Sequence, residues 1–170
     1  MLPAYLCVMN YFELFGFPVA PKVDKSVLAQ KYFDLQKRNH PDFFTQGSEQ
    51  EKEEALQQSA AINKAFTTFQ NDEKTIEYFL QHAGSIEKDE KYQLPPQFLM
   101  EMMELNESLA EKDGVTMAAE LAELEKGLYA EIKPLVEQPA FEMTDDAMAK
   151  LKAYHYKKKY LNRILERLGD

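Results

Sequence analysis

The segment His40-Pro41-Asp42 brings together an imidazole, a restricted backbone and a carboxylate within three residues. A histidine beside a carboxylate can serve general base chemistry, but a catalytic site also needs a nucleophile or a substrate pocket. No serine or cysteine nucleophile is recognisable from its spacing, and the other histidines, His82 and His155, are scattered along the chain. Pro41 fixes φ and so narrows the orientations of its neighbours for docking. We therefore expect a docking loop and not an enzyme.

The sequence on both sides of this segment indicates an exposed turn between two antiparallel helices. The basic pair Lys37-Arg38 precedes it, and a loop that contains Gly47 follows it. A purely structural interpretation stays open, in which His40 and Asp42 only cap the turn, as short polar side chains often do.

The composition limits the kinds of partner and cofactor. The chain of 170 residues has a net charge of −9, whereas nucleic-acid affinity comes from clustered basic side chains. Its one cysteine, Cys7, cannot by itself form a disulfide or hold zinc or an iron–sulfur cluster. No apolar run reaches the 18 or so residues of a membrane span. We expect a bacterial cytoplasmic protein with no metal, cofactor, nucleic-acid or membrane partner, and with residues 1–8 as an extension upstream of Met9.

The elements that must position the loop are all helical. Asp24 can cap a helix that Pro41 stops, and Ser48 with Glu51 forms a capping box for the next helix. A short apolar turn at 11–15 precedes these helices, and a short helix at 72–82, ended by Gly84, follows them. The polar stretch 85–93 then marks a boundary. Three longer patterns follow, at about 95–112, 115–137 and 145–168, which favours an antiparallel three-helix bundle. The fold class expected is all-α, with domains at 9–84 and 95–170 and a linker at 85–94.

The first of these three patterns has more apolar residues than a core needs. Positions about 100° apart place Phe98, Met102, Leu105 and Leu109 in one stripe, which is sufficient to face the core. Leu99, Met100 and Met103 fall on the far side among carboxylates. Such a mixed surface suits a partner, although a neighbouring helix or the N-terminal domain could also cover it.

The order of elements in residues 10–83 resembles a J-domain: a short apolar helix, a basic helix, the His-Pro-Asp loop and a capped antiparallel helix. The resemblance implies that the loop docks on the ATPase domain of a DnaK-type chaperone and stimulates ATP hydrolysis. In this chain the implied chaperone-binding residues are His40, Pro41, Asp42, Lys31, Lys37 and Arg38. Asn39 stands where J-domains often have an aromatic residue.

The whole of residues 9–170 resembles the HscB family of iron–sulfur cluster assembly co-chaperones. The strings that carry the resemblance are Asn10-Tyr11-Phe12-Glu13-Leu14-Phe15-Gly16, Gln58-Ser59-Ala60-Ala61-Ile62-Asn63 and Phe98-Leu99-Met100-Glu101. It implies two partners, the chaperone HscA and the scaffold protein IscU, which carries the cluster. The implied scaffold-binding residues are Leu99, Met100, Met103, Glu104, Glu107, Glu111 and Tyr154.

Two alternatives remain beside this interpretation. One is a J-domain protein whose helical bundle serves a different client. The other is a non-catalytic helical interaction module that self-associates through Leu99, Met100 and Met103.

Overall fold

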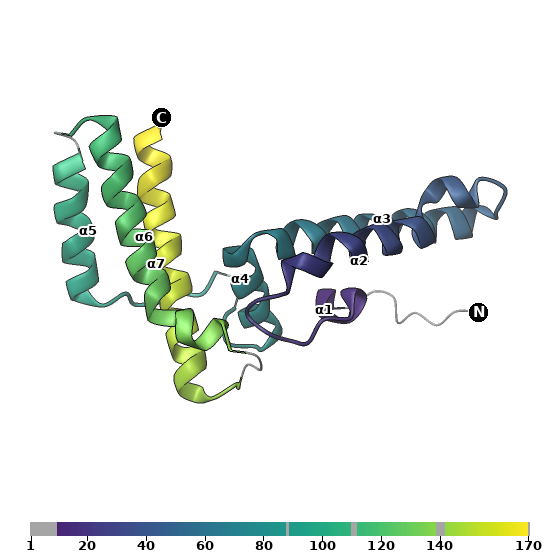
Figure 1. Ribbon diagram of the computed structural model, residues 1–170, viewed down its shortest axis with the longest axis horizontal. Coiled ribbons are helices and arrows are strands. Elements are labelled where there is room, and N and C mark those ends of the chain that lie inside the picture. Colours follow the sequence, from purple (N-terminus) through teal and green to yellow (C-terminus); the bar gives the residue numbers. More distant parts are fainter. Residues whose placement is uncertain (1–9, 88, 110–111, 139–141, 170) are drawn as a thin grey trace. The chain divides into compact units, whose positions relative to one another are not determined.

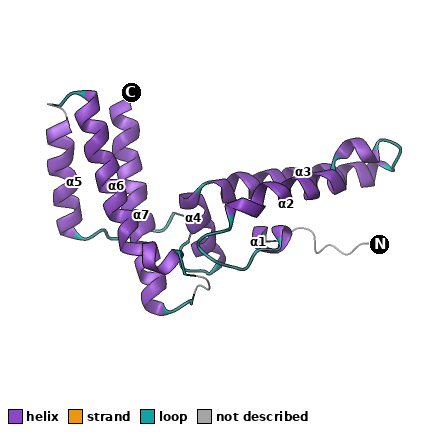
Figure 2. Ribbon diagram, in the orientation of Figure 1, coloured by secondary structure: helices purple, strands orange, loops and turns teal. Residues whose placement is uncertain are grey.

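The computed structural model describes residues 10–87, 89–109, 112–138 and 142–169, with side chains left out at 109 and 167–169 (Figure 1). The expected extension 1–8, with Cys7, and the predicted contact Glu111 lie outside the described residues. All regular structure in the described part is helical, which confirms the all-α fold class (Figure 2). None of the helices described is long and apolar enough to cross a membrane. The chain divides into two compact units between His82 and Ala83.

The first unit is built on an antiparallel helical hairpin (Figure 1). Its elements are α1 (Tyr11–Phe15), α2 (Lys25–Asn39), the 3₁₀ turn η2 (Pro41–Phe44), α3 (Glu49–Gln70) and α4 (Asp72–His82). Local signals set the ends of these helices. The Asp24 carboxylate accepts a hydrogen bond from the Ser26 amide at 2.8 Å. Ser48 and Glu51 exchange side-chain and backbone hydrogen bonds as a capping box, as the sequence predicts.

An aromatic cluster fills the core where α1, α3 and α4 meet. The side chains of Phe12, Phe69 and Phe79 are fully buried. The ring centroid of Phe69 lies 5.2 Å from that of Phe12 and 5.7 Å from that of Phe15. The amide of Tyr11 donates to the Tyr78 hydroxyl at 2.9 Å, which joins α1 to α4. This cluster anchors the base of the hairpin that carries the loop.

A polar ladder fixes α2 against α3 closer to the loop. The Asn63 side-chain oxygen accepts hydrogen bonds from the Tyr32 hydroxyl at 2.9 Å and from the Gln36 amide at 2.7 Å. The Ser59 hydroxyl donates to Gln36 at 3.1 Å, and the Tyr32 ring stacks on Phe66 at 4.1 Å. The register of the hairpin is therefore held by directional contacts, which places the loop at a defined position.

The second unit contains α5 (Pro96–Leu109), α6 (Gly114–Val136) and α7 (Asp145–Gly169). These bounds lie within a few residues of the predicted ones. The Asp113 side chain caps α6 by accepting from the amides of Val115 and Thr116, each at 3.0 Å. Acidic side chains on α6 pair with basic ones on α7: Lys157 lies 2.9 Å from Glu131, and the buried Lys158 pairs with Glu125.

The polar stretch before α5 packs on α7. Ile86 is buried, and the Tyr92 ring stacks on Tyr156 at 4.4 Å. The Lys152 ammonium donates to the Ser85 carbonyl at 2.8 Å and to the Glu90 carboxylate at 2.6 Å. The described residues of the segment expected to be a linker thus pack within the second unit.

Glu90 makes the stability of this segment depend on pH. The hydrogen bond from the Lys152 ammonium, with a weaker effect of the Tyr156 hydroxyl, holds the pKa of Glu90 below its ordinary value of 4.5. Since the pKa is lowered only on folding, the stabilisation is complete above pH 4.5 and is lost as the pH falls through the lowered value. Urea unfolding of the wild type and of Glu90→Gln should therefore differ most at neutral pH and converge in acid. A difference that stayed constant with pH would contradict this assignment.

Candidate functional site

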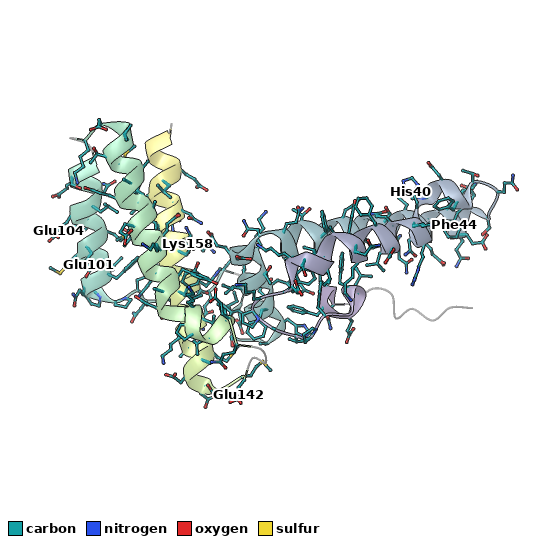
Figure 3. All side chains as sticks on the ribbon, in the orientation of Figure 1. His40, Phe44, Glu101, Glu104, Glu142 and Lys158 are labelled. Atoms are coloured by element: carbon teal, nitrogen blue, oxygen red, sulfur yellow. The ribbon has the colours of Figure 1, made fainter. Side chains whose placement is uncertain are left out.

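The His-Pro-Asp loop lies at the end of the α2–α3 hairpin, where Figure 3 shows His40 and Phe44. His40 ends α2 in an extended conformation, with φ −67° and ψ 130°, and Pro41 opens η2. The Phe43 amide donates to the His40 carbonyl at 3.0 Å, and the Gly47 amide donates to the Phe44 carbonyl at 2.9 Å. Two successive backbone turns therefore hold the loop.

The side chains of His40 and Asp42 have different structural roles. The Nδ1 atom of His40 accepts a hydrogen bond from the Asp42 amide at 3.3 Å, so the imidazole caps η2. The Asp42 carboxylate approaches the same Nδ1 atom only to 3.6 Å, and its side chain is 83% exposed. The capping interpretation thus explains the role of the His40 Nδ1 atom, but it gives no role to the exposed Asp42 carboxylate, which can meet a partner.

The last turn of α2 presents the basic side chains beside this loop. Lys37 and Arg38 are both exposed, and neither has an ion pair within the part of the chain that the structure describes. The Asn39 amide donates to the Leu35 carbonyl at 2.8 Å and so satisfies one of the last carbonyls of the helix. Asn39 therefore supports the end of α2 without an aromatic ring at this position.

Lys31 has a structural role instead of the predicted chaperone contact. Its ammonium donates to the carbonyls of Phe15 at 2.8 Å and Gly16 at 3.3 Å, and it lies 5.0 Å from the centre of the Phe17 ring. Gly16 ends α1 with φ +61°, the left-handed conformation that glycine adopts at helix ends. Because the Lys31 ammonium is occupied in tying α1 to α2, we leave it out of the contact surface.

The predicted partner face of α5 lies on the surface of the second unit. Met100 and Met103 are each 61% exposed, Glu104 and Glu107 are exposed, and Leu99 is half-buried. On the opposite stripe, Phe98 and Met102 are buried as expected, Leu105 is half-buried, and the side chain of Leu109 is outside those described. Within the second unit no neighbouring helix covers the two methionines, whereas Leu99 is partly covered.

Tyr154 lies in the core and not on this face. Its side chain is only 6% exposed, and its ring meets that of Tyr129 on α6 edge to face at 6.4 Å. Because the Tyr154 ring is buried between α6 and α7, it cannot also contact a partner. We therefore remove Tyr154 from the predicted scaffold-binding residues.

An open groove of about 730 Å³ lies between α5 and α6. Its apolar lining comes from Phe98 on α5 and from Leu124 and Leu128 on α6, with Lys157 of α7 also lining it. Helix α5 is therefore packed along one stripe and remains open toward α6.

Sequence reasoning missed two aromatic side chains near the loop. Phe33 and Phe43 are 67% and 68% exposed, the largest values among the exposed phenylalanines of the described residues. The signal for Phe33 was present, because helical spacing puts it nearly opposite the inward-facing Leu28 and Leu35.

Known proteins resemble this chain over nearly its whole length. Residues 94–169 match the family described as the HSCB C-terminal oligomerisation domain. The Co-chaperone protein HscB homolog of Vibrio cholerae serotype O1 (strain M66-2) is 34% identical over 94% of this chain and 99% of its own length. The homolog of Aliivibrio salmonicida (strain LFI1238) is 33% identical over 95% and 98%.

Two solved structures share the fold. The human co-chaperone protein HscB matches with a TM-score of 0.80 and 29% identity, over 95% of this chain and 81% of that one. The chaperone HscB from Vibrio cholerae matches with a TM-score of 0.61 and 32% identity, over 94% and 99%. With the relatives, these matches establish that the chain belongs to the HscB family of co-chaperone proteins.

Proposed function

We propose that this protein stimulates the ATPase of a DnaK-type chaperone of the HscA kind through its His-Pro-Asp loop, and delivers an IscU-type scaffold protein to it. The observation that carries the proposal is the Asp42 carboxylate, which is held at a defined position on the hairpin and is 83% exposed. The loop is ordered in the free protein, so little conformational entropy is lost when it docks. Lys37 and Arg38 add positive charge that favours an acidic chaperone surface.

ATP hydrolysis takes place in the chaperone. This protein brings the scaffold to the chaperone and stimulates hydrolysis when its loop docks. The α5 face holds the scaffold with its cluster, which is cargo and not a cofactor of this chain. Met100 and Met103 supply adaptable apolar contact, while Glu104 and Glu107 favour a basic surface on the scaffold. The two binding surfaces lie in separate compact units of the chain.

The test is steady-state ATP hydrolysis by a purified HscA-type chaperone as this protein is titrated, with and without the scaffold. Stimulation that rises further with scaffold supports both halves of the proposal. Stimulation that is indifferent to scaffold would retain the chaperone activity and assign a different client. No stimulation at all would leave only a helical binding module.

A second candidate for the α5 face is self-association, which the description of the matching family as an oligomerisation domain favours. A second copy of the chain would cover Met100 and Met103 in the same way as a scaffold. Sedimentation over a range of concentrations separates the two: a mass that stays monomeric rules this candidate out, whereas a dimer abolished by Met103→Ser supports it.

We expect Met103→Ser to weaken scaffold binding about tenfold, because it removes an exposed apolar contact from the centre of the face. Stimulation of the chaperone without scaffold should not change. Met143→Ser is the matched control, since Met143 is 60% exposed in the same unit but lies outside α5. Equal losses in the two variants would show that the α5 face is not the binding surface. Isothermal titration calorimetry with the purified scaffold measures both.

A further inference from the structure

Phe33 and Phe43 are largely exposed, and each meets one neighbouring ring edge to face: Phe33 meets Tyr32 at 5.9 Å and Phe43 meets His40 at 6.2 Å. Each leaves about two-thirds of its surface in water, whereas Phe12, Phe69 and Phe79 of the same unit are fully buried. Single exposed apolar residues are common, but two large rings beside a binding loop form a patch that a partner can bury.

The two rings lie on one continuous strip of surface with the loop. Phe33 and Lys37 are four residues apart on α2, and Lys37 and His40 are three apart, so each pair lies on the same side of the helix. Beyond the helix, the centroid of the Phe43 ring lies 6.2 Å from that of His40 in an edge-to-face arrangement. We call Phe33, Lys37, His40 and Phe43 the docking strip.

The docking strip places an aromatic ring at each end of a basic segment. From Phe33 to His40 the helix rises about 10 Å, a length that one protein surface can cover. Burying a phenylalanine side chain contributes more free energy than a solvent-exposed ion pair supplies. The electrostatic contacts of Lys37 and Arg38 are screened by salt, but the apolar ones are not.

We propose that Phe33 and Phe43 are apolar anchors for the chaperone surface that receives the His-Pro-Asp loop. This inference rests on the proposed function and specifies its partner: an acidic surface with an apolar patch on each side. The occupant is the chaperone because the strip includes His40 itself, so whatever docks on the loop also covers these rings. The aromatic anchors make this docking less dependent on salt than a contact made by basic residues alone.

The test is the concentration of this protein that gives half-maximal stimulation of an HscA-type chaperone ATPase, at low and at high salt. The double variant Phe33→Ser/Phe43→Ser should raise that concentration about tenfold or more at both salt levels. The variant Phe33→Leu/Phe43→Leu keeps apolar surface and should recover most of the loss. Leu56→Ser is the matched control, because Leu56 is 61% exposed on α3 of the same unit and is not part of the docking strip.

Each outcome distinguishes this inference from the proposed function. If the serine variant stimulates like the wild type while His40→Asn needs a much higher concentration for half-maximal stimulation, the anchors are refuted and the proposed function stands. If the wild type does not stimulate at all, both fall. Equal losses in the serine and leucine variants would also refute the anchors, because an apolar contact would survive in the latter. Thermal unfolding of all variants checks that the fold is unchanged.

Discussion

Replacement of His40 by asparagine will strongly weaken stimulation of the chaperone ATPase while leaving the fold intact. The asparagine side-chain oxygen lies close to the position of Nδ1, so it can still accept the hydrogen bond from the Asp42 amide that caps η2. What is lost is the imidazole surface that a partner would meet. Loss of a central interface residue costs about 2 kcal/mol or more, which raises the half-maximal concentration at least about thirtyfold. The ATPase titration measures this shift directly.

The companion variant Asp42→Asn removes the exposed charge without changing the shape of the side chain. It should reduce stimulation to a similar degree, because the exposed carboxylate is the group that would meet the chaperone. The fold should be unchanged, because its one contact with that carboxylate among the described residues is the 3.6 Å approach to His40. Scaffold binding is the internal control and should match the wild type in both variants. Parallel loss of scaffold binding and stimulation would mean that the two activities do not reside on separate surfaces.

Phe69→Ala will lower the free energy of unfolding of the first unit by about 3–5 kcal/mol. The ring is fully buried and contacts Phe12, Phe15 and Tyr78 around the base of the hairpin. Domains of this size have a total stability of only about 5–10 kcal/mol, so the loss removes a large part of it. Hydrogen exchange followed peptide by peptide will show faster exchange in α1–α4, with α5–α7 protected as before.

Phe33→Ala is the control for this stability measurement, because it removes the same ring from an exposed site of the same unit. We expect a change within about 0.5 kcal/mol, as for most surface substitutions. If the two variants were equally stable, the aromatic cluster would not be the core of the unit.

Local signals explain how far the sequence predicts the fold. The bounds 72–82 of α4 and the stop of α2 before Pro41 agree with the structure because capping residues and proline act on their own backbone. The packing of the stretch before α5 could not be predicted in this way. It depends on Lys152 reaching Glu90, 62 positions away in sequence, and no periodicity encodes such a pairing.

The same distinction applies to the candidate site. The loop and the exposed face of α5 are visible in the sequence because one is a motif and the other is a helical stripe. Lys31 looks like a free base on a basic helix, but its partners are backbone carbonyls 15 and 16 residues earlier. Tyr154 is amphipathic, so its residue type does not decide whether the ring is buried, whereas the structure packs it against Tyr129.

The groove beside α5 has a consequence for how binding strength can be set. A helix of 14 residues is marginally ordered on its own, and here Phe98 and Met102 are its buried side chains among those described. A partner that binds the outer face therefore also stabilises the helix, and part of its contact energy offsets the ordering. The affinity for such a partner therefore also depends on buried residues of α5. A substitution at the buried Met102 that loosens α5 weakens binding without altering any residue that the partner touches.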